Sequence, residues 1–448
     1  MELIEPGHPD YDRTRAVFNG MIDRRPALIA RCATPRDVAD ALAHGRRQGL
    51  DIAVRAGGHS AAGMSTNDGG LVVDLRPMNG VNVDAERRTA RVGGGATWGE
   101  FDRAAQVHGL ATTGGRASTT GVGGLTLGGG SGWLERRFGL ACDNLRSATL
   151  VTADGREVTA SATENPELFW ALHGGGGNFG VVTSFEFALH HVGPTVLAGL
   201  LFWPADAAWE VARAYRDLAS DAPEELGSAL IFVTAPAEEG IPDTVAGRTA
   251  AVVAVLWSGE VADGEAVLKP WRDLSPALDL VEPMGYADFQ CMIDDPHGLH
   301  NYCTADYHDD FPDAALDVLV EYGMERRAPH AQQILLPWGG AVARVADDAT
   351  PLNRSGVRWV THPFAMWDDP ADTEANIAWC KGFHRDIAAY ANGAAYLNFI
   401  GHEGEQRIRA AFGDEKHGRL AAVKAAWDPD NMFRGNHNIR PTAAAVTS

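Results

Sequence analysis

The most unusual chemistry-bearing feature of the chain is a cluster of glycines. Nine of the nineteen residues from Gly114 to Gly132 are glycine, at positions 114, 115, 121, 123, 124, 128, 129, 130 and 132. This density costs too much chain entropy for a helix or strand interior, so we expect positive φ angles or close approach to a ligand. Exposed N–H groups in such a turn form a concave anion site, and a diphosphate is the natural ligand. The alternative is that the glycines only permit tight turns.

A second cluster, Gly174 to Gly177, gives the segment Gly175 to Gly180 the pattern G-x-G-x-x-G of dinucleotide sites. In those sites the pattern follows a strand and opens a helix. Here residues 164–172 have helical character and residues 181–189 alternate as a strand, so the order is reversed. A nicotinamide dinucleotide site of that kind is therefore not expected. The phosphate loop of ATPases, G-x-x-x-x-G-K-[ST], does not occur either.

A histidine follows two glycines directly after an apolar strand, in the segment Arg55-Ala56-Gly57-Gly58-His59-Ser60. Glycine lets the main chain come close to a ligand, and a histidine fixed just after it is presented to the same ligand. On residue chemistry alone, a single histidine is more often structural than functional.

Helix-start signals and apolar runs predict the elements that position these segments. Thr34 caps a helix with Pro35 at its first position and Gly49 as its stop, and Thr97 with Glu100 forms a capping box for another. Strands are expected at 27–30, 52–54 and 71–75, and a hairpin around 84–88. Beyond about residue 194 the pattern predicts a second unit of helices and an antiparallel sheet. The fold class is α+β.

Composition narrows the class of protein further. The 448 residues suffice for two or three domains, and the net charge of −21 would repel nucleic acid and anionic membranes. Five unpaired cysteines fit reduced thiols in a cytoplasm. The acidic start lacks the basic region of a signal peptide, and the most apolar window, 193–205, is too short to span a bilayer. We expect a soluble cytoplasmic protein without nucleic-acid or membrane partners.

Six segments, in this order along the chain, resemble the berberine bridge enzyme-like FAD-linked oxidases. They are RAGGHS at 55–60, TTGGRASTTGVGGLTLGGG at 112–130, GLACDN at 139–144, LFWALHGGGGNFGVVT at 168–183, YLNF at 396–399 and WDPDNMFRGNHNIRP at 427–441. The resemblance spans nearly the whole chain, although residues 200–390 carry little that is diagnostic.

The resemblance implies a two-domain α+β fold of the PCMH-type, vanillyl-alcohol-oxidase-like FAD-binding class. An FAD-binding domain at 1–193 would be completed by the C-terminal segment 400–448. A substrate-binding domain at 194–399 would be built on an antiparallel sheet flanked by helices.

The resemblance also implies how FAD is held. His59 falls on the family histidine that bonds covalently to the flavin 8α-methyl carbon, an attachment that raises the flavin potential. Members with a second covalent bond use a cysteine in the 115–121 loop, where this chain has Ala117, and Cys142 lies well downstream. We therefore expect one covalent bond, through His59. The residues expected to bind FAD are His59, Arg55, Ala56, Gly57, Gly58, Ser60, Met64, Gly114, Gly115, Ser118, Thr119, Gly121, Gly123, Gly124, Gly128, Val182, Asn436 and Asn438.

Candidate catalytic residues follow from the same resemblance. Thr120 lies at the position that gates oxygen access to the flavin, and a β-branched residue there favours an oxidase. Phe399 replaces a tyrosine that in several members acts as a base or hydrogen-bonds the substrate, so the base is unassigned. Tyr396 and Asn398 lie one strand period apart and should share a face near the flavin. A core position is the alternative for Tyr396.

The substrate pocket is expected on the sheet of the second domain, over the flavin and without charges. Its expected residues are Trp359, Thr361 and Pro363 on one strand, Gln333 and Leu335 on a neighbouring strand, and Tyr302 or His300 nearby. A possible metal cluster comprises His297, His300, His308, Asp294, Asp295 and Asp306. Its spacing matches no complete site, so a solvated acidic loop and no metal are expected.

Together these features predict a flavin-dependent oxidase. It would remove a hydride from a small organic substrate, such as an alcohol, an amine or a secondary-metabolite ring, to covalently bound FAD, and reduce O2 to hydrogen peroxide. The alternatives are a covalent-flavin dehydrogenase or flavin oxygenase of secondary metabolism with another acceptor, and an FAD-binding protein without turnover. The sequence leaves the oligomeric state open.

Overall fold

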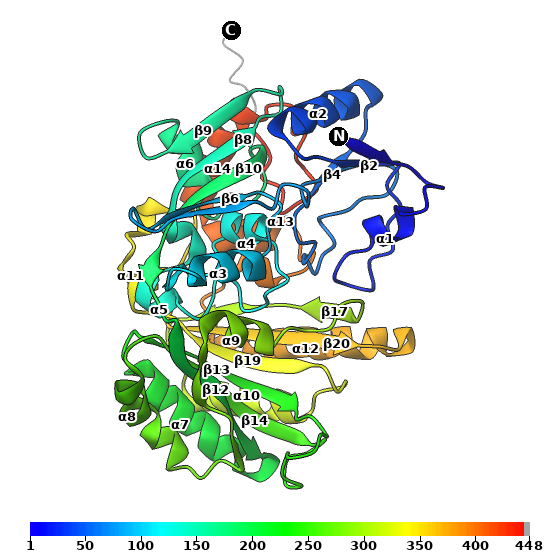
Figure 1. The fold of residues 1–448 in the computed structure, drawn as a ribbon. Coiled ribbons are helices and arrows are strands. Elements are labelled where there is room, and N and C mark those ends of the chain that lie inside the picture. The colour runs from blue at the N-terminus through cyan, green and yellow to red at the C-terminus, as the bar shows by residue number, and fades with distance from the viewer. Residues whose placement is uncertain (443–448) are drawn as a thin grey trace.

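The structure is a computed structural model that describes residues 1–442. Two small sheets lie above one large sheet (Figure 1). The first small sheet has the order β1-β2-β4-β3, with β2, β4 and β3 parallel. Its strands are β1 (Glu2–Ile4), β2 (Leu28–Arg31), β3 (Ile52–Arg55) and β4 (Leu71–Asp74). Helix α2 (Pro35–Gln48) begins at Thr34, whose side chain accepts from the Asp37 N–H, and stops at Gly49 with φ 66°. The predicted start and stop are confirmed.

The second small sheet has the order β5-β6-β10-β8-β9, with antiparallel pairs throughout. Its strands are β5 (Val81–Asp84), β6 (Thr89–Gly93), β8 (Leu145–Val151), β9 (Glu157–Ser161) and β10 (Val181–Ala188). The segment Gly175 to Gly180 lies between helix α6 (Pro166–Ala171) and strand β10. This helix-then-strand order confirms that the glycine pattern does not belong to a Rossmann unit.

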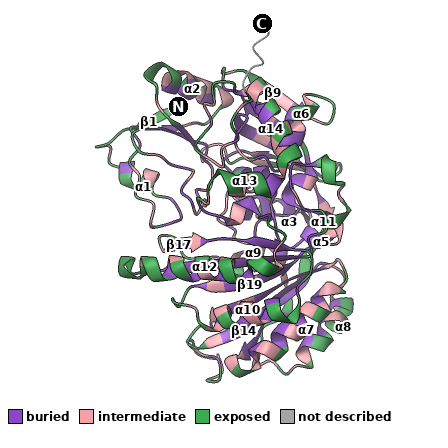
Figure 2. Cartoon of the chain, turned by 180° about the vertical axis from the view of Figure 1, so that it is seen from behind, coloured by how far each residue is buried: buried purple, intermediate pink, exposed green. Residues whose placement is uncertain are grey.

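The large sheet has nine strands, all paired antiparallel, as predicted. They are β12 (Thr195–Pro204), β13 (Leu226–Thr234), β14 (Thr249–Trp257), β15 (Leu278–Asp279), β16 (Glu282–Gly285), β17 (His300–Cys303), β18 (Asp306–His308), β19 (Gln332–Pro337) and β20 (Trp359–Trp367). Four helices cover its lower face: α7 (Ala208–Ser220), α8 (Val261–Arg272), α10 (Asp313–Met324) and α12 (Thr373–Ile387) (Figures 1 and 2). Its upper face packs against the half that holds the small sheets.

Shorter elements connect these layers. They are α1 (Tyr11–Arg15), α3 (Trp98–Gln106), β7 (Leu110–Ala111), α4 (Val122–Leu127), α5 (Glu135–Phe138), β11 (His190–His191), α9 (Tyr286–Met292), α11 (Ala341–Arg344), α13 (Glu405–Phe412) and α14 (Asp414–Trp427). The predicted capping box is present at the start of α3, where Thr97 and Glu100 exchange hydrogen bonds.

The chain returns from the large sheet to the upper half through its C-terminal segment, where α14 contacts α6. Lys424 of α14 is completely buried and donates to the carbonyls of Asn178 and Phe433 and to the Asp428 carboxylate. Asp428 in turn accepts from the Met432 and Phe433 N–H groups. A buried charge is stable only when it is paired and hydrogen-bonded in this way, so this cluster fixes the segment that follows it.

Helices α3 and α9 join the two halves through a buried carboxylic acid. Asp102 accepts from Gln290 Nε2 at 3.0 Å, and the same amide donates to the Gly115 carbonyl at 3.1 Å. Burial raises the pKa of Asp102 to about 7. The pKa of Asp102 is higher in the folded protein than in the unfolded chain. The free energy of unfolding therefore falls as pH rises from about 4 to about 7.

We therefore expect Asp102→Asn to stabilise the protein more at pH 8 than at pH 5. The asparagine oxygen still accepts the hydrogen bond from Gln290, and the substitution removes the ionisable group. The gain in the free energy of unfolding should therefore be roughly 2–3 kcal/mol larger at the higher pH. Denaturant unfolding at both pH values measures it. Asp310→Asn, at an exposed position, is the control and should show no such difference. An equal effect of Asp102→Asn at both pH values would contradict the raised pKa.

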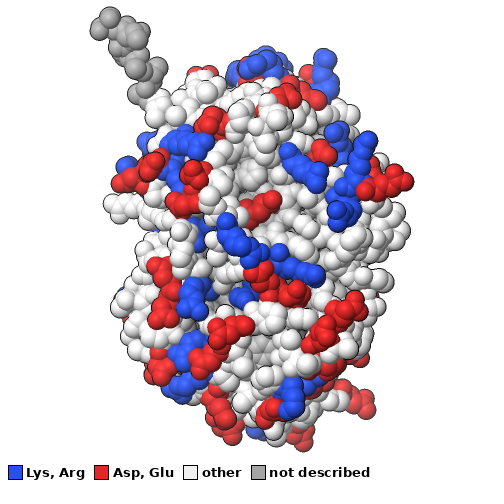
Figure 3. All heavy atoms as spheres, turned by 90° about the vertical axis from the view of Figure 1, so that its left-hand side faces the viewer, with Lys and Arg blue, Asp and Glu red and all other residues white. Residues whose placement is uncertain are grey.

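Acidic and basic side chains alternate over the surface drawn in Figure 3, without a broad area of one sign. In the part of the chain that the structure describes, no helix combines the length and apolar character needed to cross a membrane.

Candidate active site

A cavity of about 620 Å³ lies between the two halves of the molecule. Glycine-rich loops of the upper half form one part of its wall, and the upper face of the large sheet forms another. The glycines that line it are Gly57, Gly58, Gly94, Gly121, Gly123, Gly124, Gly128, Gly174, Gly175, Gly176, Gly177, Gly180 and Gly435. Both glycine clusters seen in the sequence therefore meet in one place.

His59 lines this cavity and is held by contacts on several sides. Its ring stacks on Phe18 with centroids 4.2 Å apart and meets the edge of His297 at 5.5 Å. Nε2 hydrogen-bonds Thr119 Oγ1 at 2.9 Å, and Nδ1 lies 3.4 Å from Thr120 Oγ1. Burial, with a smaller effect of His297, lowers the pKa of His59 to about 3. The imidazole is therefore neutral and keeps a nitrogen lone pair for bonding.

Two glycines allow the loop of His59 to touch the loop of Thr119 and Thr120. A Cβ on Gly57 would lie 2.3 Å from the Gly121 nitrogen, and a Cβ on Gly121 would lie 2.3 Å from the Gly57 nitrogen. No side chain fits between two backbones at this distance. The glycines therefore fix which hydroxyl groups His59 can reach.

The structure places twelve of the expected FAD-binding residues in the cavity wall. They are Ala56, Gly57, Gly58, His59, Ser60, Met64, Gly121, Gly123, Gly124, Gly128, Val182 and Asn436. Asn436 donates from Nδ2 to the Gly177 carbonyl at 2.9 Å, while its buried Oδ1 has no partner among the described residues. An unpaired buried amide oxygen is costly and suits a ligand donor.

Six of the expected FAD-binding residues do not line the large cavity: Arg55, Gly114, Gly115, Ser118, Thr119 and Asn438. Gly114 and Gly115 are packing positions, since a Cβ would lie 2.4 Å from the Trp98 ring and 2.9 Å from Leu125, respectively. Arg55 donates to the carbonyls of Thr14 and Ala16. The resemblance implies FAD contacts for these three residues, but Gly114 and Gly115 pack against other side chains and the Arg55 guanidinium is used by two backbone carbonyls.

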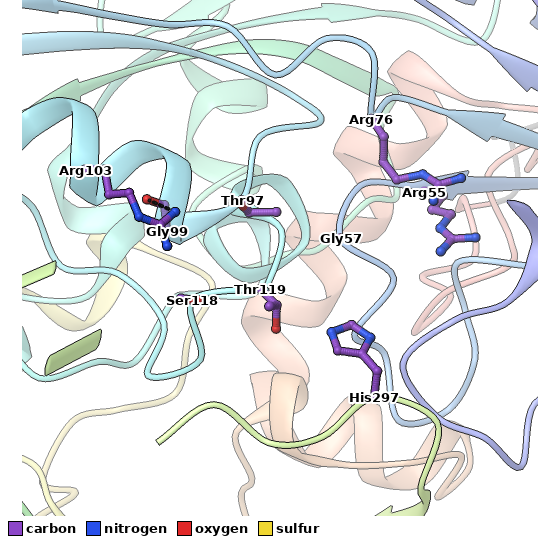
Figure 4. Close-up of a pocket in the computed structure, with 9 residues that line it drawn as sticks. All are labelled: Arg55, Gly57, Arg76, Thr97, Gly99, Arg103, Ser118, Thr119 and His297. Atoms are coloured by element: carbon purple, nitrogen blue, oxygen red, sulfur yellow. Dashed lines mark hydrogen bonds between the residues drawn. The ribbon is translucent and has the colours of Figure 1, made fainter. Parts of the chain in front are cut away.

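Arg55, Ser118 and Thr119 instead line a smaller pocket of about 420 Å³, which shares Gly57 with the large cavity (Figure 4). Arg76, Arg103 and His297 complete the polar part of its wall. Figure 4 shows Thr119 and His297 pointing toward one another across this pocket. Thr119 thus lines the small pocket and also hydrogen-bonds His59.

The cavity fits a flavin dinucleotide by the chemistry of its wall. Backbone of the two glycine clusters offers N–H groups for a diphosphate. A Cβ added at Gly124 would meet open space, and one at Gly176 or Gly177 would have no contact closer than 3.6 Å. Apolar residues at the sheet side suit a ring system, and His59 lines the same cavity. We identify the loops carrying His59 and the glycines as the part of the chain that would hold FAD.

The structure corrects the expectation for Tyr396. Residues Leu397–Phe399 form a 3-10 helix, so Tyr396 and Asn398 are not one strand period apart. Tyr396 is completely buried and does not line the cavity; its Oη accepts from the N–H groups of Gly130 and Ser131 at 2.7 and 2.9 Å. Burial raises the pKa of its phenol. Tyr396 is therefore a core residue, which was the alternative to a place near the flavin, and its hydroxyl binds the glycine loop at Gly130 and Ser131.

Asn398 and Thr120 both line the cavity. Asn398 Nδ2 donates to the Leu125 carbonyl and to Tyr396 Oη, both at 2.9 Å. Its amide is thus held by the glycine loop, with the side chain against Gly128.

The expected substrate residues do not lie on the face of the large sheet that lines the cavity. Trp359 and Leu335 pack among the helices of the lower face, and Thr361 hydrogen-bonds His308. None of the seven expected positions lines the cavity: Trp359, Thr361, Pro363, Gln333, Leu335, Tyr302 and His300. The cavity wall is formed instead by the alternate residues Gln332, Ile334, Leu336, His362, Phe364, Asn301 and Cys303. A shift of one residue in phase moves every side chain of a strand to the other face.

His362 is a cavity residue that the sequence interpretation missed. It stacks on Phe399 with ring centroids 4.1 Å apart, and its Nδ1 lies 3.0 Å from the Thr304 carbonyl. Burial lowers the pKa of His362 to about 4. The carbonyl partner requires the proton on Nδ1, so Nε2 of this neutral ring is an acceptor. The only sequence signal was a histidine within an apolar strand.

The possible metal cluster is dispersed in the structure. His308 is buried between Tyr390 and Thr361, His297 packs on His59, and Asp294 accepts from the Ser118 N–H at 2.6 Å. Within residues 1–442, no group of three or more His, Cys, Asp or Glu side chains is placed to hold a metal ion.

Comparison with known proteins agrees with this geometry. The family described as FAD binding domain matches residues 26–161, and the family described as berberine and berberine like matches residues 395–440. The chain is 31% identical to (R)-6-hydroxynicotine oxidase of Paenarthrobacter nicotinovorans, over 98% of this chain and 96% of that protein. It is also 31% identical to an FAD-linked oxidoreductase of Dictyostelium discoideum, over 93% and 89% of the two chains.

Solved structures give the same result. The crystal structure of 6-hydroxy-D-nicotine oxidase from Arthrobacter nicotinovorans superposes with a TM-score of 0.88 at 28% identity, covering 98% of this chain and 97% of that one. Sequence motifs, cavity and relatives therefore agree, and the chain belongs to the berberine bridge enzyme-like family of FAD-linked oxidoreductases.

Proposed function

We propose that the protein carries FAD on a single covalent bond to His59, oxidises a C–H bond next to oxygen or nitrogen in a small organic molecule, and passes the electrons to O2. The product of the second step is hydrogen peroxide. Alcohols, amines and rings of secondary metabolites are the substrate classes considered.

The neutral imidazole of His59 in the cavity wall carries this proposal. A histidine can form a bond to carbon only through an unprotonated nitrogen, and the pKa of His59, about 3, keeps it unprotonated at neutral pH. The stack on Phe18 and the hydrogen bond to Thr119 hold the ring in one orientation. Ala117 lines the cavity where a second, cysteinyl bond would form, which supports a single attachment.

Bound FAD would supply the acceptor for a hydride. Around it, the chain provides an apolar wall at Ile334, Leu336 and Phe364 that excludes water from the substrate side. Thr120, beside His59, is proposed to leave room for O2, and Asn398 is proposed to orient the substrate or ring. Phe399 has no polar group, so the proton acceptor must be another residue.

Two further proposals concern the whole chain. The FAD-binding domain is proposed to comprise residues 1–193 and 400–448, with the substrate-binding domain at 194–399. Sheets formed before residue 190 and a separate sheet formed by 195–367 support this division.

A cytoplasmic location is proposed because all five cysteines are free thiols.

Reoxidation by air tests the acceptor without knowledge of the substrate. The flavin of the purified protein is reduced by light under anaerobic conditions, with added EDTA as the electron donor, and then mixed with aerated buffer. We expect rapid return of the oxidised spectrum with about one hydrogen peroxide per flavin. Slow return would instead identify a dehydrogenase that uses another acceptor.

A further inference from the structure

Among the described residues, the wall of the large cavity contains one carboxylate, that of Asp295. Asp295 lies in the segment between α9 and β17. Its neighbours attach this segment to the flavin side: Asp294 accepts from Ser118 Oγ at 2.5 Å, and the His297 ring meets the His59 ring. Asp295 is therefore placed at the junction of the His59 loop and the large sheet.

The carboxylate of Asp295 is held without being neutralised. Its Oδ1 accepts from Gln332 Nε2 at 2.9 Å, on the cavity face of β19. Within the described residues, no Lys, Arg or His side chain forms an ion pair with it. Burial and the neighbouring Asp294 raise the pKa of Asp295 to about 6, so it is mainly ionised at pH 7 and above. A half-buried carboxylate in this state gains from a cation.

The remainder of the cavity wall does not supply that cation. Arg116 is the other charged residue of the wall, and its guanidinium already pairs with Glu135 at 2.8 Å. His59, His362 and His437 also line the cavity; burial lowers their pKa values to about 3, about 4 and about 4, so all three are neutral. On the sheet side the wall around Asp295 is apolar, with Ile293 and Ile334. The cavity thus presents one uncompensated negative charge beside an apolar surface.

We propose that Asp295 is the substrate-recognition carboxylate of the cavity and that the substrate is an organic amine, protonated at neutral pH, on an apolar body. The ammonium group donates to Asp295, whose orientation Gln332 fixes, and the apolar body lies against the sheet. This inference rests on the proposed function, because it names the substrate class of the same site. It assigns specificity to a residue that lies outside the motifs shared with the family.

The test measures binding rather than turnover, with benzylamine and benzyl alcohol as probes of the same skeleton. Each is titrated at pH 8 into the flavin-containing protein, and calorimetry together with the flavin absorption spectrum gives the dissociation constants. We expect benzylamine to bind at least about tenfold more tightly than benzyl alcohol, which corresponds to about 1.4 kcal/mol. Equal or tighter binding of the alcohol, or no binding of the amine, would overturn the proposal.

Variants separate the carboxylate from general effects of charge. Asp295→Asn should reduce the preference for benzylamine to less than about twofold, whereas Asp295→Glu should keep part of it. Asp310→Asn, which removes one exposed carboxylate elsewhere, should leave the preference unchanged. Retention of the full preference in Asp295→Asn would overturn the assignment. Unfolding curves and flavin content of each variant show whether it has folded.

The outcomes distinguish this inference from the proposed function. If the flavin is covalent and reacts with O2 but the amine has no advantage, only the inference fails. If the protein carries no acid-stable flavin, the proposed function fails, and calorimetry still reports whether Asp295 selects the amine.

Discussion

His59→Ala is expected to abolish acid-stable flavin completely. The variant should bind FAD without a covalent bond, because the glycine loops and Asn436 remain, and acid should then release the flavin into solution. Loss of the bond should also lower the reduction potential of the bound flavin. Acid precipitation measures the first effect, and equilibration with a reference dye under anaerobic conditions measures the second.

The matched control for this variant is His108→Ala, at an exposed position at the C-terminal end of α3. It should keep both the acid-stable flavin and the potential of the unaltered protein. Retention of acid-stable flavin in His59→Ala would mean that another nucleophile forms the bond. Cys303 would then be examined first, because its thiol lies in the cavity wall on the large sheet.

Gly57→Ala is expected to prevent flavin binding through the backbone alone. The added methyl would lie 2.3 Å from the Gly121 nitrogen and 2.8 Å from its Cα, so the two loops must separate. Separation would pull His59 away from Thr119 and Thr120 and should cost about 1–3 kcal/mol of stability. Flavin content after purification and denaturant unfolding measure the two effects.

Gly80→Ala is the control for this substitution, since a Cβ there has nothing within 4 Å. It should keep full flavin content. A Gly57→Ala protein that still carried covalent flavin would contradict the view that the contact of the two loops positions His59.

Much of the flavin half could be predicted because its signals are local. Thr34 and Thr97 cap helices through hydrogen bonds within four residues, and glycine density marks backbone that approaches a ligand. The order of α6 and β10 around the second glycine cluster excluded a Rossmann site on the same local grounds. The position of His59 follows from its place directly after such a turn.

The substrate side could not be predicted in the same way, because β20 is buried on both faces. Eight of its nine residues, Trp359 to Trp367, are buried, so the sequence carries no alternation that tells the cavity face from the helix face. Trp359 and Thr361 were assigned to the cavity, but His362 and Phe364 occupy it. The predicted lining residues of β20 therefore differ from the observed ones by a shift of one position along the strand.

Asp295 and Tyr396 illustrate a second limit, which is tertiary contact. Asp295 lies in a loop, and only its contact with Gln332 and the attachment of Asp294 to Ser118 bring it to the cavity. Tyr396 resembles a site residue in sequence, yet its hydroxyl is used by two backbone N–H groups of the glycine loop. No local pattern distinguishes these situations.

The attachment of FAD to His59 is tested most directly by the mass and colour of the denatured protein. The purified chain is precipitated with acid, and the visible spectrum and intact mass of the pellet are recorded, followed by peptide mass analysis. We expect a yellow pellet, one FAD of added mass, and an adduct confined to the peptide that contains His59. A colourless pellet of unmodified mass, or an adduct on any other residue, would contradict it.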